Sequence, residues 1–296
     1  MFGDKLFTVN SGSNTFAAFH IPSNNPQHPI LIGAAVSTGG DVPNSVAYSS
    51  KHNLACVTNT GTKSGVQCFT ISDKKSLKPF GSFQPIKLTT PQTLPPLGPT
   101  NTVSDIAFNP RENFLMATVK GDGTNPGYIY VWKVSHDGKM DAPVISQPKE
   151  LLVNFGFNFI AHKRAVITDP SFGAAFVTIH DDLTVTVDNK VAVPNQAAIC
   201  WSAYSEATSS VFLLDAGAPT IATLDSHTGG MKATIPVKTE TMGSFDGAVA
   251  GNHLYVLEAA SGVSVYDIRA KQPKAIQNLN LTSLGSRAGW TGIAVY

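Results

Sequence analysis

Residues 158–179, NFIAHKRAVITDPSFGAAFVTI, contain three short apolar runs separated by turn-forming residues. NFIAHK leads into AVITDP, whose apolar part ends at Asp169, and AAFVTI follows after SFG. Apolar runs of this length, bounded by Gly, Asn, Asp or Ser, are typical of β-strands. The stretch therefore predicts three consecutive antiparallel strands with a polar residue at the end of the second.

The same unit recurs along the whole chain. Runs that resemble AVITDP are LFTVNS, LACVTNT, FLMATVKG, VFLLDA and LYVLEA. The polar residues that end the six runs are Asn10, Asn59, Lys120, Asp169, Asp215 and Glu258, at spacings of 49, 61, 49, 46 and 43. Repeats of roughly 40–50 residues with four antiparallel strands each indicate a β-propeller, in which neighbouring sheets cover one another. We predict an all-β protein with six four-stranded blades in a single domain, residues 1–296.

The two ends of the chain complement each other in this pattern. The unit at Leu6–Asn10 lacks the run that precedes the other five, and Gly289–Tyr296 (GWTGIAVY) is such a run with nothing after it. Joining the ends would place Asn10 48 residues after Glu258, which is one repeat. Strand 289–296 is therefore expected to close the ring. Seven blades, or a pair of β-sandwich domains, are the alternatives.

Composition excludes several classes of function. Lys plus Arg number 21 and Asp plus Glu 20, so the net charge is +1, which argues against a nucleic-acid binder or an electrostatic membrane anchor. No apolar run approaches the ~20 residues of a membrane span. The N-terminus shows no signal peptide, so the protein is expected to be cytoplasmic, or secreted with its leader removed. The pattern predicts no oligomeric state.

The cysteines allow two interpretations. Cys56 and Cys68 lie on consecutive predicted strands of one blade and could face each other across a hairpin. Facing positions can satisfy the ~7 Å limit that a disulfide sets on Cα separation. Two buried thiols are the alternative, and Cys200 is left over in either case.

Four stretches carry a resemblance to a known family: LFTVNSGSNTFAAFHI, GPTNTVSDIAFNP, TVKGD and ITDPSFGAA. They resemble the fungal carboxymuconate-cyclase-like propellers, which belong to the wider lactonase-type group. A subset of such propellers, the hetero-Diels–Alderases of tropolonic sesquiterpene biosynthesis, is also similar. The resemblance implies an enzyme of fungal secondary metabolism. We therefore expect a cyclase that directs a hetero-Diels–Alder reaction of a quinone methide formed by dehydration.

In a propeller the loops after the second strands share one face with the loops that lead into the innermost strands. We expect the substrate, a small hydrophobic molecule, to bind there. Catalytic roles are assigned to Lys120, Asp122 and Asp169, because a lysine can donate to a developing oxyanion and a carboxylate can accept a proton. Substrate-binding roles are assigned to Asn10, Asn59, Asp105, Phe172, Trp201, Asp246, Glu258 and Trp290.

Each of these assignments has a structural alternative. Asn and Asp often end strands because they bond local backbone, Lys120 and Asp122 could form a solvated loop ion pair, and tryptophans often pack in cores. No cofactor and no metal ligand set is predicted, although carboxylate and amide oxygens at the channel mouth would suit Ca²⁺. Two other functions remain open. One is a lactonising or lactone-opening enzyme, with Lys120 and Arg287 as the cations that would bind carboxylate. The other is a non-enzymatic binding propeller.

Overall fold

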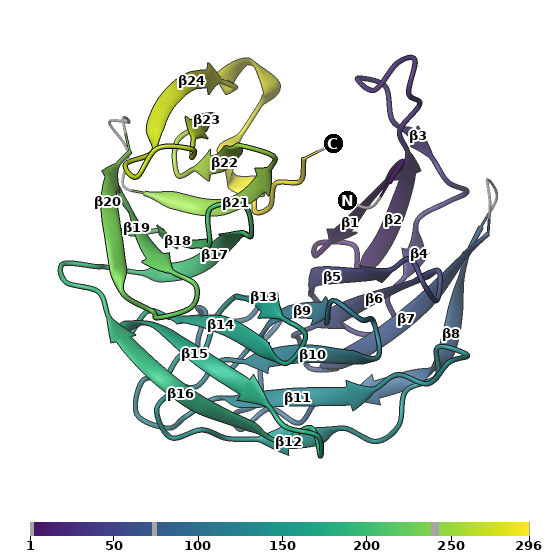
Figure 1. Cartoon of the computed structure of the whole chain (residues 1–296). Coiled ribbons are helices and arrows are strands. Elements are labelled where there is room, and N and C mark those ends of the chain that lie inside the picture. Colours follow the sequence, from purple (N-terminus) through teal and green to yellow (C-terminus); the bar gives the residue numbers. More distant parts are fainter. Residues whose placement is uncertain (1–2, 73–75, 238–242, 296) are drawn as a thin grey trace. The chain divides into compact units, whose positions relative to one another are not determined.

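Six antiparallel β-sheets, each built from a consecutive segment of the chain, make up the fold of the computed structural model (Figure 1). The structure describes residues 3–72, 76–237 and 243–295. Within these residues the six four-stranded sheets confirm the predicted blade number and argue against seven. The likeness of the sheets to one another follows from the repeat in the sequence.

Sheets 1 to 3 contain twelve strands. Their bounds are β1 Lys5–Asn10, β2 Thr15–His20, β3 Ile30–Leu31, β4 Val36–Ser37, β5 Pro43–Ser49, β6 Leu54–Asn59, β7 Gly65–Ser72, β8 Ser76–Pro85, β9 Val103–Phe108, β10 Phe114–Val119, β11 Tyr128–Lys133 and β12 Val144–Ser146.

Sheets 4 to 6 contain the other twelve strands. Their bounds are β13 Phe157–Ala161, β14 Arg164–Asp169, β15 Gly173–Ile179, β16 Val185–Ala192, β17 Ile199–Ser205, β18 Ser210–Asp215, β19 Thr220–Asp225, β20 Met231–Pro236, β21 Ser244–Ala250, β22 His253–Glu258, β23 Gly262–Asp267 and β24 Lys274–Asn280. Two 3-10 turns follow, η1 Thr282–Leu284 and η2 Arg287–Gly289.

Contacts along the chain divide it into two compact units. Unit 1 consists of Met1–Asn154 and Ile179–Thr186, and unit 2 of Phe155–Thr178 and Val187–Val295. Unit 1 holds sheets 1 to 3, and unit 2 holds most of sheet 4 with sheets 5 and 6. The expectation of a single domain over residues 1–296 stays a prediction.

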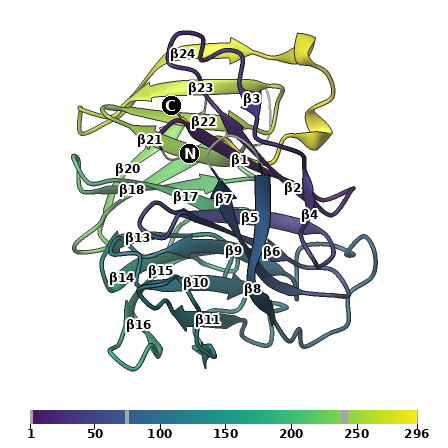
Figure 2. The same cartoon turned by 90° about the vertical axis from the view of Figure 1, so that its right-hand side faces the viewer.

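Apolar side chains fill the space between neighbouring sheets inside each unit. In unit 1, one cluster joins sheets 1 and 2 around Phe16 and Phe69, and another joins sheets 2 and 3 around Leu115 and Trp132. The strands β5 and β9 of sheets 2 and 3 lie side by side (Figures 1 and 2). In unit 2, sheets 5 and 6 share a cluster around Phe212. The second strand of a sheet is therefore buried on both faces, which explains its nearly continuous apolar sequence.

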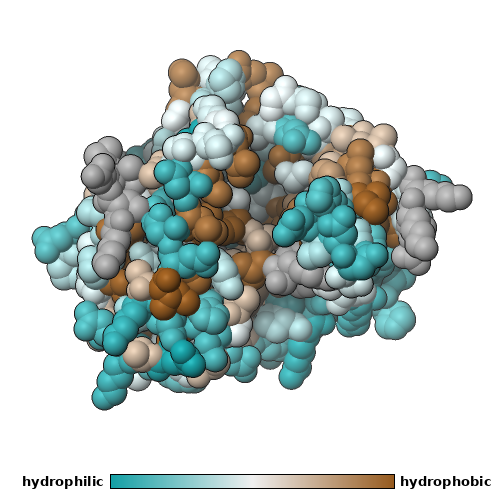
Figure 3. Space-filling view, turned by 90° about the horizontal axis from the view of Figure 1, so that it is seen from above, coloured by the Kyte–Doolittle hydropathy of each residue, from teal (hydrophilic) through white to brown (hydrophobic). Residues whose placement is uncertain are grey.

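The outer strands have the opposite pattern. All seven residues of β24 are exposed, including Ile276 and Leu279, and the two residues of β3 are exposed as well. Hydrophobic side chains accordingly lie among hydrophilic ones on the face drawn in Figure 3. Exposed apolar residues scattered in this way are normal for a soluble fold.

The predicted C-terminal strand is wrong for residues 289–295, and Tyr296 lies outside the described residues. Gly289 ends η2, and residues 290–295 form no strand. The backbone N–H of Ile293 donates to Asp246 Oδ2 at 2.8 Å instead of joining a strand ladder. Gly289 and Gly292 also weaken strand formation in this segment, because glycine has no side chain to pack and loses more backbone entropy.

Sheet 1 lacks the innermost strand that the other sheets have, and residues 289–295 do not supply it as predicted. β1 pairs with β2, and the two short strands β3 and β4 both pair with β2. The four strands of sheet 1 are thus β1, β2 and an outer edge in two pieces.

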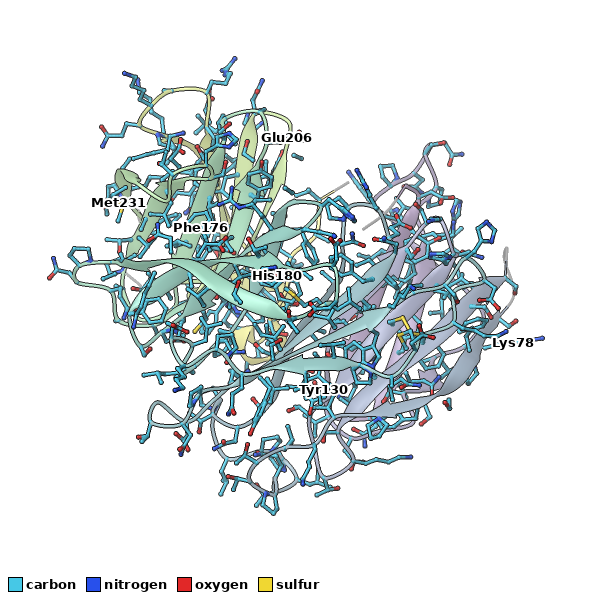
Figure 4. The ribbon with its side chains drawn as sticks, turned by 60° about the horizontal axis from the view of Figure 1, so that its bottom comes forward. Lys78, Tyr130, Phe176, His180, Glu206 and Met231 are labelled. Carbon is cyan, nitrogen blue, oxygen red and sulfur yellow. A yellow bond between two sulfur atoms is a disulfide. The ribbon has the colours of Figure 1, made fainter. Side chains whose placement is uncertain are left out.

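Cys56 and Cys68 are directly opposite one another in β6 and β7, with a Cα separation of 3.9 Å. They form a disulfide, visible as a yellow bond in Figure 4. Of the two interpretations of the sequence, the structure supports the bonded one. Both side chains are buried in the cluster between sheets 2 and 3.

Candidate functional site

The six polar residues of the repeat lie at the ends of the second strands, or of β1 in the first sheet, as the register predicts. Asn10, Asn59, Asp169, Asp215 and Glu258 are the last residues of β1, β6, β14, β18 and β22, and Lys120 directly follows β10. All except the exposed Asn10 are buried. The hydrogen-bond partners of each side chain show which residues have a structural role and which are candidates for a catalytic or binding role.

Asn59 and Asn10 have different surroundings in unit 1. Asn59 Nδ2 donates to the carbonyl of Gly65 at 3.5 Å, and its Oδ1 is buried with no hydrogen-bond partner in the described structure. Asn10 Nδ2 donates to Thr15 Oγ1 across the β1–β2 turn. Asn10 thus makes a local side-chain bond across its turn, whereas the amide oxygen of Asn59 lacks a partner in the described structure.

Lys120 and Asp122 occupy one tight loop of unit 1. Lys120 is 6% exposed, and its backbone N–H donates to Thr102. The exposed carboxylate of Asp122 accepts from the backbone N–H groups of Thr124 and Asn125 and from Asn125 Nδ2. These hydrogen bonds, chiefly those from Asn125, lower the pKa of Asp122. A carboxylate held this way stabilises its own turn, and the catalytic role of the two residues stays a prediction.

Asp105 connects sheets 2 and 3. Its Oδ1 accepts from Ser45 Oγ at 2.8 Å and from the backbone N–H of Ile106 at 2.8 Å. Asn44 lies next to this contact and donates to the carbonyls of Val103 and Ser104. These bonds give Asp105 a structural role inside β9, and its substrate-binding role stays a prediction.

Asp215 in unit 2 is a structural carboxylate. Its two oxygens accept from four backbone N–H groups, which belong to Ala197, Ala198, Gly217 and Ala218. Since each oxygen is already bonded, Asp215 fixes the loops around it.

Asp169 and Phe172 lie in one loop of unit 2. Asp169 Oδ1 accepts from the N–H and the hydroxyl of Ser171, and the ammonium of Lys190 lies 4.1 Å from the centroid of the Phe172 ring. The third predicted catalytic residue thus belongs to unit 2, whereas Lys120 and Asp122 belong to unit 1.

Trp201 lies in β17 and is only half-buried. The ring of Phe155 meets it edge-on with centroids 5.3 Å apart, and Gly156 lies so close to the indole that a Cβ there would approach it to 2.4 Å. The two rings pack against each other within unit 2, and the substrate-binding role of Trp201 stays a prediction.

Glu258 lies at one end of sheet 6 with a sparse set of partners. The carboxylate accepts at Oε1 from Ser264 Oγ, which itself accepts from Asn278 Nδ2 at 2.9 Å. Gly262 lies beside the other oxygen, since a Cβ there would be 3.4 Å from Oε2. Burial, with added repulsion from the Glu258 carboxylate, raises the pKa of Tyr266 to about 12. Glu258 is therefore a buried carboxylate held by one hydroxyl.

Ser244 adds a second polar group beside Glu258. The two residues are direct cross-strand partners at the ends of β21 and β22, so their side chains lie on the same face of the sheet. Ser244 Oγ is buried without a hydrogen-bond partner in the described structure.

Arg287 lies beside the same end of the sheet. Its Nε donates to the carbonyls of Glu258 at 2.8 Å and Ala260 at 3.1 Å, and its Nη1 donates to the carbonyl of Trp290. The guanidinium carbon lies 4.7 Å from the centroid of the Phe245 ring. Nη2 is buried and has no partner among the described residues. Burial lowers the pKa of Arg287.

Three residues of the predicted set are thus linked through this segment by main-chain contacts: Arg287 bonds the backbone carbonyls of Glu258 and Trp290, and Asp246 accepts from the N–H of Ile293. We call Ser244, Glu258 and Arg287 the sheet 6 cluster. Sequence analysis named Arg287 as a carboxylate binder but left it out of the site, and it did not find Ser244. Ser244 could have been found from its cross-strand position opposite Glu258. An alignment of the repeats that included the first strand of each sheet would show this pairing.

Neither a metal-binding cluster nor an apolar membrane-spanning helix is present among the described residues. They contain no group of three or more His, Cys, Asp or Glu side chains that could hold a metal ion. They also contain no helix long and apolar enough to cross a membrane.

No family model and no curated protein matches the sequence. Solved structures do match. A candidate 6-phosphogluconolactonase from Bacteroides uniformis is 14% identical, with a TM-score of 0.72 over 94% of this chain and 83% of that one. Another from Bacteroides fragilis is 12% identical, with a TM-score of 0.67 over 94% and 82%. A protein from Lactobacillus plantarum is 13% identical, also with a TM-score of 0.67 over 94% and 82%. At these identities the likeness shows the fold, which is that of a β-propeller.

Proposed function

We propose that the protein is an enzyme that opens or closes the lactone ring of a small carboxylated molecule at the sheet 6 cluster. The observation that carries the proposal is the unpartnered Nη2 of Arg287, whose Nε donates to the backbone carbonyl of the buried Glu258. Buried polar groups usually have partners, so an unpartnered guanidinium N–H suits a ligand oxygen. The names of the two Bacteroides neighbours and the resemblance to carboxymuconate-cyclase-like propellers support a lactone as that ligand.

The chemistry needs a proton acceptor and an oxyanion donor. In ring opening, water attacks the lactone carbonyl and gives its proton to Glu258. The ring C–O bond then breaks, and the departing oxygen takes the proton from Glu258. Arg287 donates to the carbonyl oxygen as negative charge develops on it, an arrangement that lowers barriers because the donor is fixed in advance. Ring closure is the reverse sequence.

The test is a hydrolysis assay with 6-phosphogluconolactone and carboxylated unsaturated lactones, followed by proton release. We expect Arg287→Gln to lower kcat/KM by about 10²–10³ and Glu258→Gln by about 10²–10⁴. Arg111→Gln, an exposed arginine outside the cluster, is the matched control and should retain wild-type turnover. Melting curves of each variant separate loss of activity from loss of folding. The proposal fails if the wild type turns over none of these lactones or if both variants match it.

Cycloaddition of a quinone methide is the second candidate, and the half-buried pair Phe155 and Trp201 is the observation that favours it. Aromatic walls can orient an alkene, and orientation supplies much of the rate in such reactions. The assay combines a tropolone-type quinone-methide precursor with a cyclic terpene alkene and compares the product ratio with the uncatalysed mixture. Trp201→Ala should loosen selectivity, because this ring would orient the alkene. An unchanged rate and ratio with the wild type would exclude this function.

A further inference from the structure

We propose that unit 2 carries a second ligand site, for a small tetrahedral oxyanion such as phosphate or a phosphomonoester. The site is a hollow of about 230 Å³ between sheet 5 and the loop that follows β23. Its polar lining consists of Thr208, Ser210, Thr223, Lys232, Arg269 and Lys271. Two labels in Figure 4 help to locate this region: Glu206 precedes Thr208 by two residues, and Met231 directly precedes Lys232.

This hollow is distinct from the sheet 6 cluster. Glu258 lies near Gly262, where β23 begins, whereas the hollow adjoins Ile268, just after β23 ends. A strand of six residues spans roughly 20 Å at about 3.3 Å per residue. A ligand in the hollow therefore does not reach the proposed catalytic groups, and this inference does not depend on the proposed function.

Two threonine hydroxyls carry the inference. Thr223 is 2% exposed, and its Oγ1 is buried without a hydrogen-bond partner in the described structure. Thr208 Oγ1 is in the same state, and both residues line the hollow. Burying a hydroxyl without a partner is costly, so such groups normally bond protein, water or ligand. A ligand in the hollow would give both hydroxyls an acceptor.

The strand register supports the direction of the Thr223 side chain. Its neighbours Ala222 and Leu224 belong to the cluster between sheets 4 and 5, whereas Ile221 belongs to the cluster between sheets 5 and 6. Because side chains alternate along a strand, Thr223 lies on the face of sheet 5 that is directed toward sheet 6. Its cross-strand partner Phe212 lines the hollow as well.

The charged side chains that line the hollow favour an anion as its ligand. Lys232, Arg269 and Lys271 line the hollow, and no carboxylate does so among the described residues. Lys232 Nζ is fixed by bonds to Ser210 Oγ and the carbonyl of Thr208, both at 2.9 Å. Its carboxylate neighbour Asp225 is 3.9 Å away.

The two other cations differ in what they already bind. Arg269 uses Nε and Nη2 for Asp267, which leaves Nη1. Lys271 has no ion pair in the part of the chain that the structure describes. Ammonium, guanidinium and hydroxyl donors from four separate segments suit an acceptor with oxygens in several directions, which favours a tetrahedral oxyanion over a planar carboxylate.

The ligand must be small. The hollow is below the roughly 300–1,000 Å³ usual for drug-sized ligands, so it fits inorganic phosphate or the phosphorylated end of a small metabolite. The buried side chains of Phe212 and Ile268 give it an apolar floor, against which carbon atoms of a phosphomonoester can lie. Inorganic phosphate and a phosphomonoester share the phosphate group, and the experiment below distinguishes between these two ligands.

The experiment measures binding of inorganic phosphate and of glycerol 3-phosphate to the full chain by titration calorimetry and by the shift in melting temperature. Thr223→Val removes the hydroxyl and keeps the shape of the side chain. We expect it to weaken phosphate binding about tenfold, since a hydrogen bond to a charged group is lost. Its melting temperature without ligand should equal or exceed that of the wild type, because an unpartnered hydroxyl is removed.

Lys271→Gln should weaken phosphate binding as well, and Lys149→Gln, an exposed lysine outside the hollow, is its matched control and should not. Tighter binding of glycerol 3-phosphate than of inorganic phosphate would support a phosphomonoester, and equal binding would support phosphate itself. The proposal is overturned if the wild type binds neither probe saturably, or if Thr223→Val binds phosphate as the wild type does. Water would then be what fills the hollow.

Discussion

At the residue scale, the buried carboxylates that end β18 and β22 differ in how completely they are bonded. Asp215 accepts four backbone N–H groups, whereas Glu258 accepts one side-chain hydroxyl. The two positions are equivalent in the repeat, so a shared strand-ending role does not account for Glu258. A buried charge with few partners is costly to stability and is common where a protein needs a reactive group.

Asp215→Asn should destabilise the protein and leave catalysis intact. An asparagine side chain has only one acceptor oxygen. Its NH₂ group would replace the second carboxylate oxygen and would face backbone N–H donors that it cannot accept from. We expect a loss of about 1.5–3 kcal/mol in the free energy of unfolding, the usual value for hydrogen bonds to a charged group. Urea titration measures it. A loss of turnover in the folded variant would contradict this structural role.

Glu112 predicts a pH dependence of stability. Burial alone would raise the pKa of Glu112, but hydrogen bonds from Ser49, Lys51 and Ser50 outweigh it and lower the pKa. A lowered pKa in the folded state means stability that is present above the unfolded value, about 4.3, and lost as pH falls below it. These bonds join the turns of sheets 2 and 3.

Glu112→Gln tests this effect. At pH 7 the variant should be about 1–3 kcal/mol less stable than the wild type, and the difference should shrink as pH falls toward the carboxyl pKa. Denaturant titrations at several pH values measure both. Glu150→Gln, an exposed glutamate, is the control. A difference that stays constant with pH would contradict the role of the carboxylate.

At the scale of elements, the disulfide ties β6 to β7. The two cysteines are 12 residues apart in sequence, and a bond that closes a loop of this size stabilises by about 3 kcal/mol through the unfolded chain. Mass spectrometry without reductant should find a linked peptide, and alkylation of both thiols after denaturation would contradict the bond. The double variant Cys56→Ala, Cys68→Ala should unfold at lower denaturant concentration.

The sequence predicted the strands well and the C-terminal segment badly, for one physical reason. Strands such as β10 and β18 are buried throughout, so their nearly continuous apolar sequences indicate their position in the core. None of residues 290–295 is fully buried, and the segment is positioned by the Arg287 guanidinium and the Asp246 carboxylate. Long-range side-chain bonds of this kind leave no periodic trace, so apolar letters alone suggested a strand.

The same reason limits what the sequence said about the candidate site. It located Glu258 by its place in the repeat, because that place is fixed by strand register. It could not tell Asp122 from a reactive carboxylate, since the turn that uses the Asp122 oxygens becomes visible only in three dimensions. It also missed the threonine hydroxyls of the hollow, which look like ordinary strand and turn residues.

At the scale of the whole molecule, residues 1–296 are expected to unfold in one cooperative transition. A four-stranded sheet cannot bury both of its faces alone, so unfolding of one sheet exposes the neighbour that packs against it in the same unit. Leu115 in unit 1 and Leu214 in unit 2 are both fully buried, and truncation of either to alanine should cost about 2–5 kcal/mol. In one domain, each substitution lowers the same transition.

Differential scanning calorimetry of the wild type, Leu115→Ala and Leu214→Ala decides between one domain and two. We expect a single peak that moves as a whole in both variants. Tryptophan fluorescence is an independent check, since Trp132 reports unit 1 and Trp201 and Trp290 report unit 2. Two peaks, of which each variant moves only one, would mean that the units unfold separately. The single-domain prediction would then be wrong, although the number of sheets was predicted correctly.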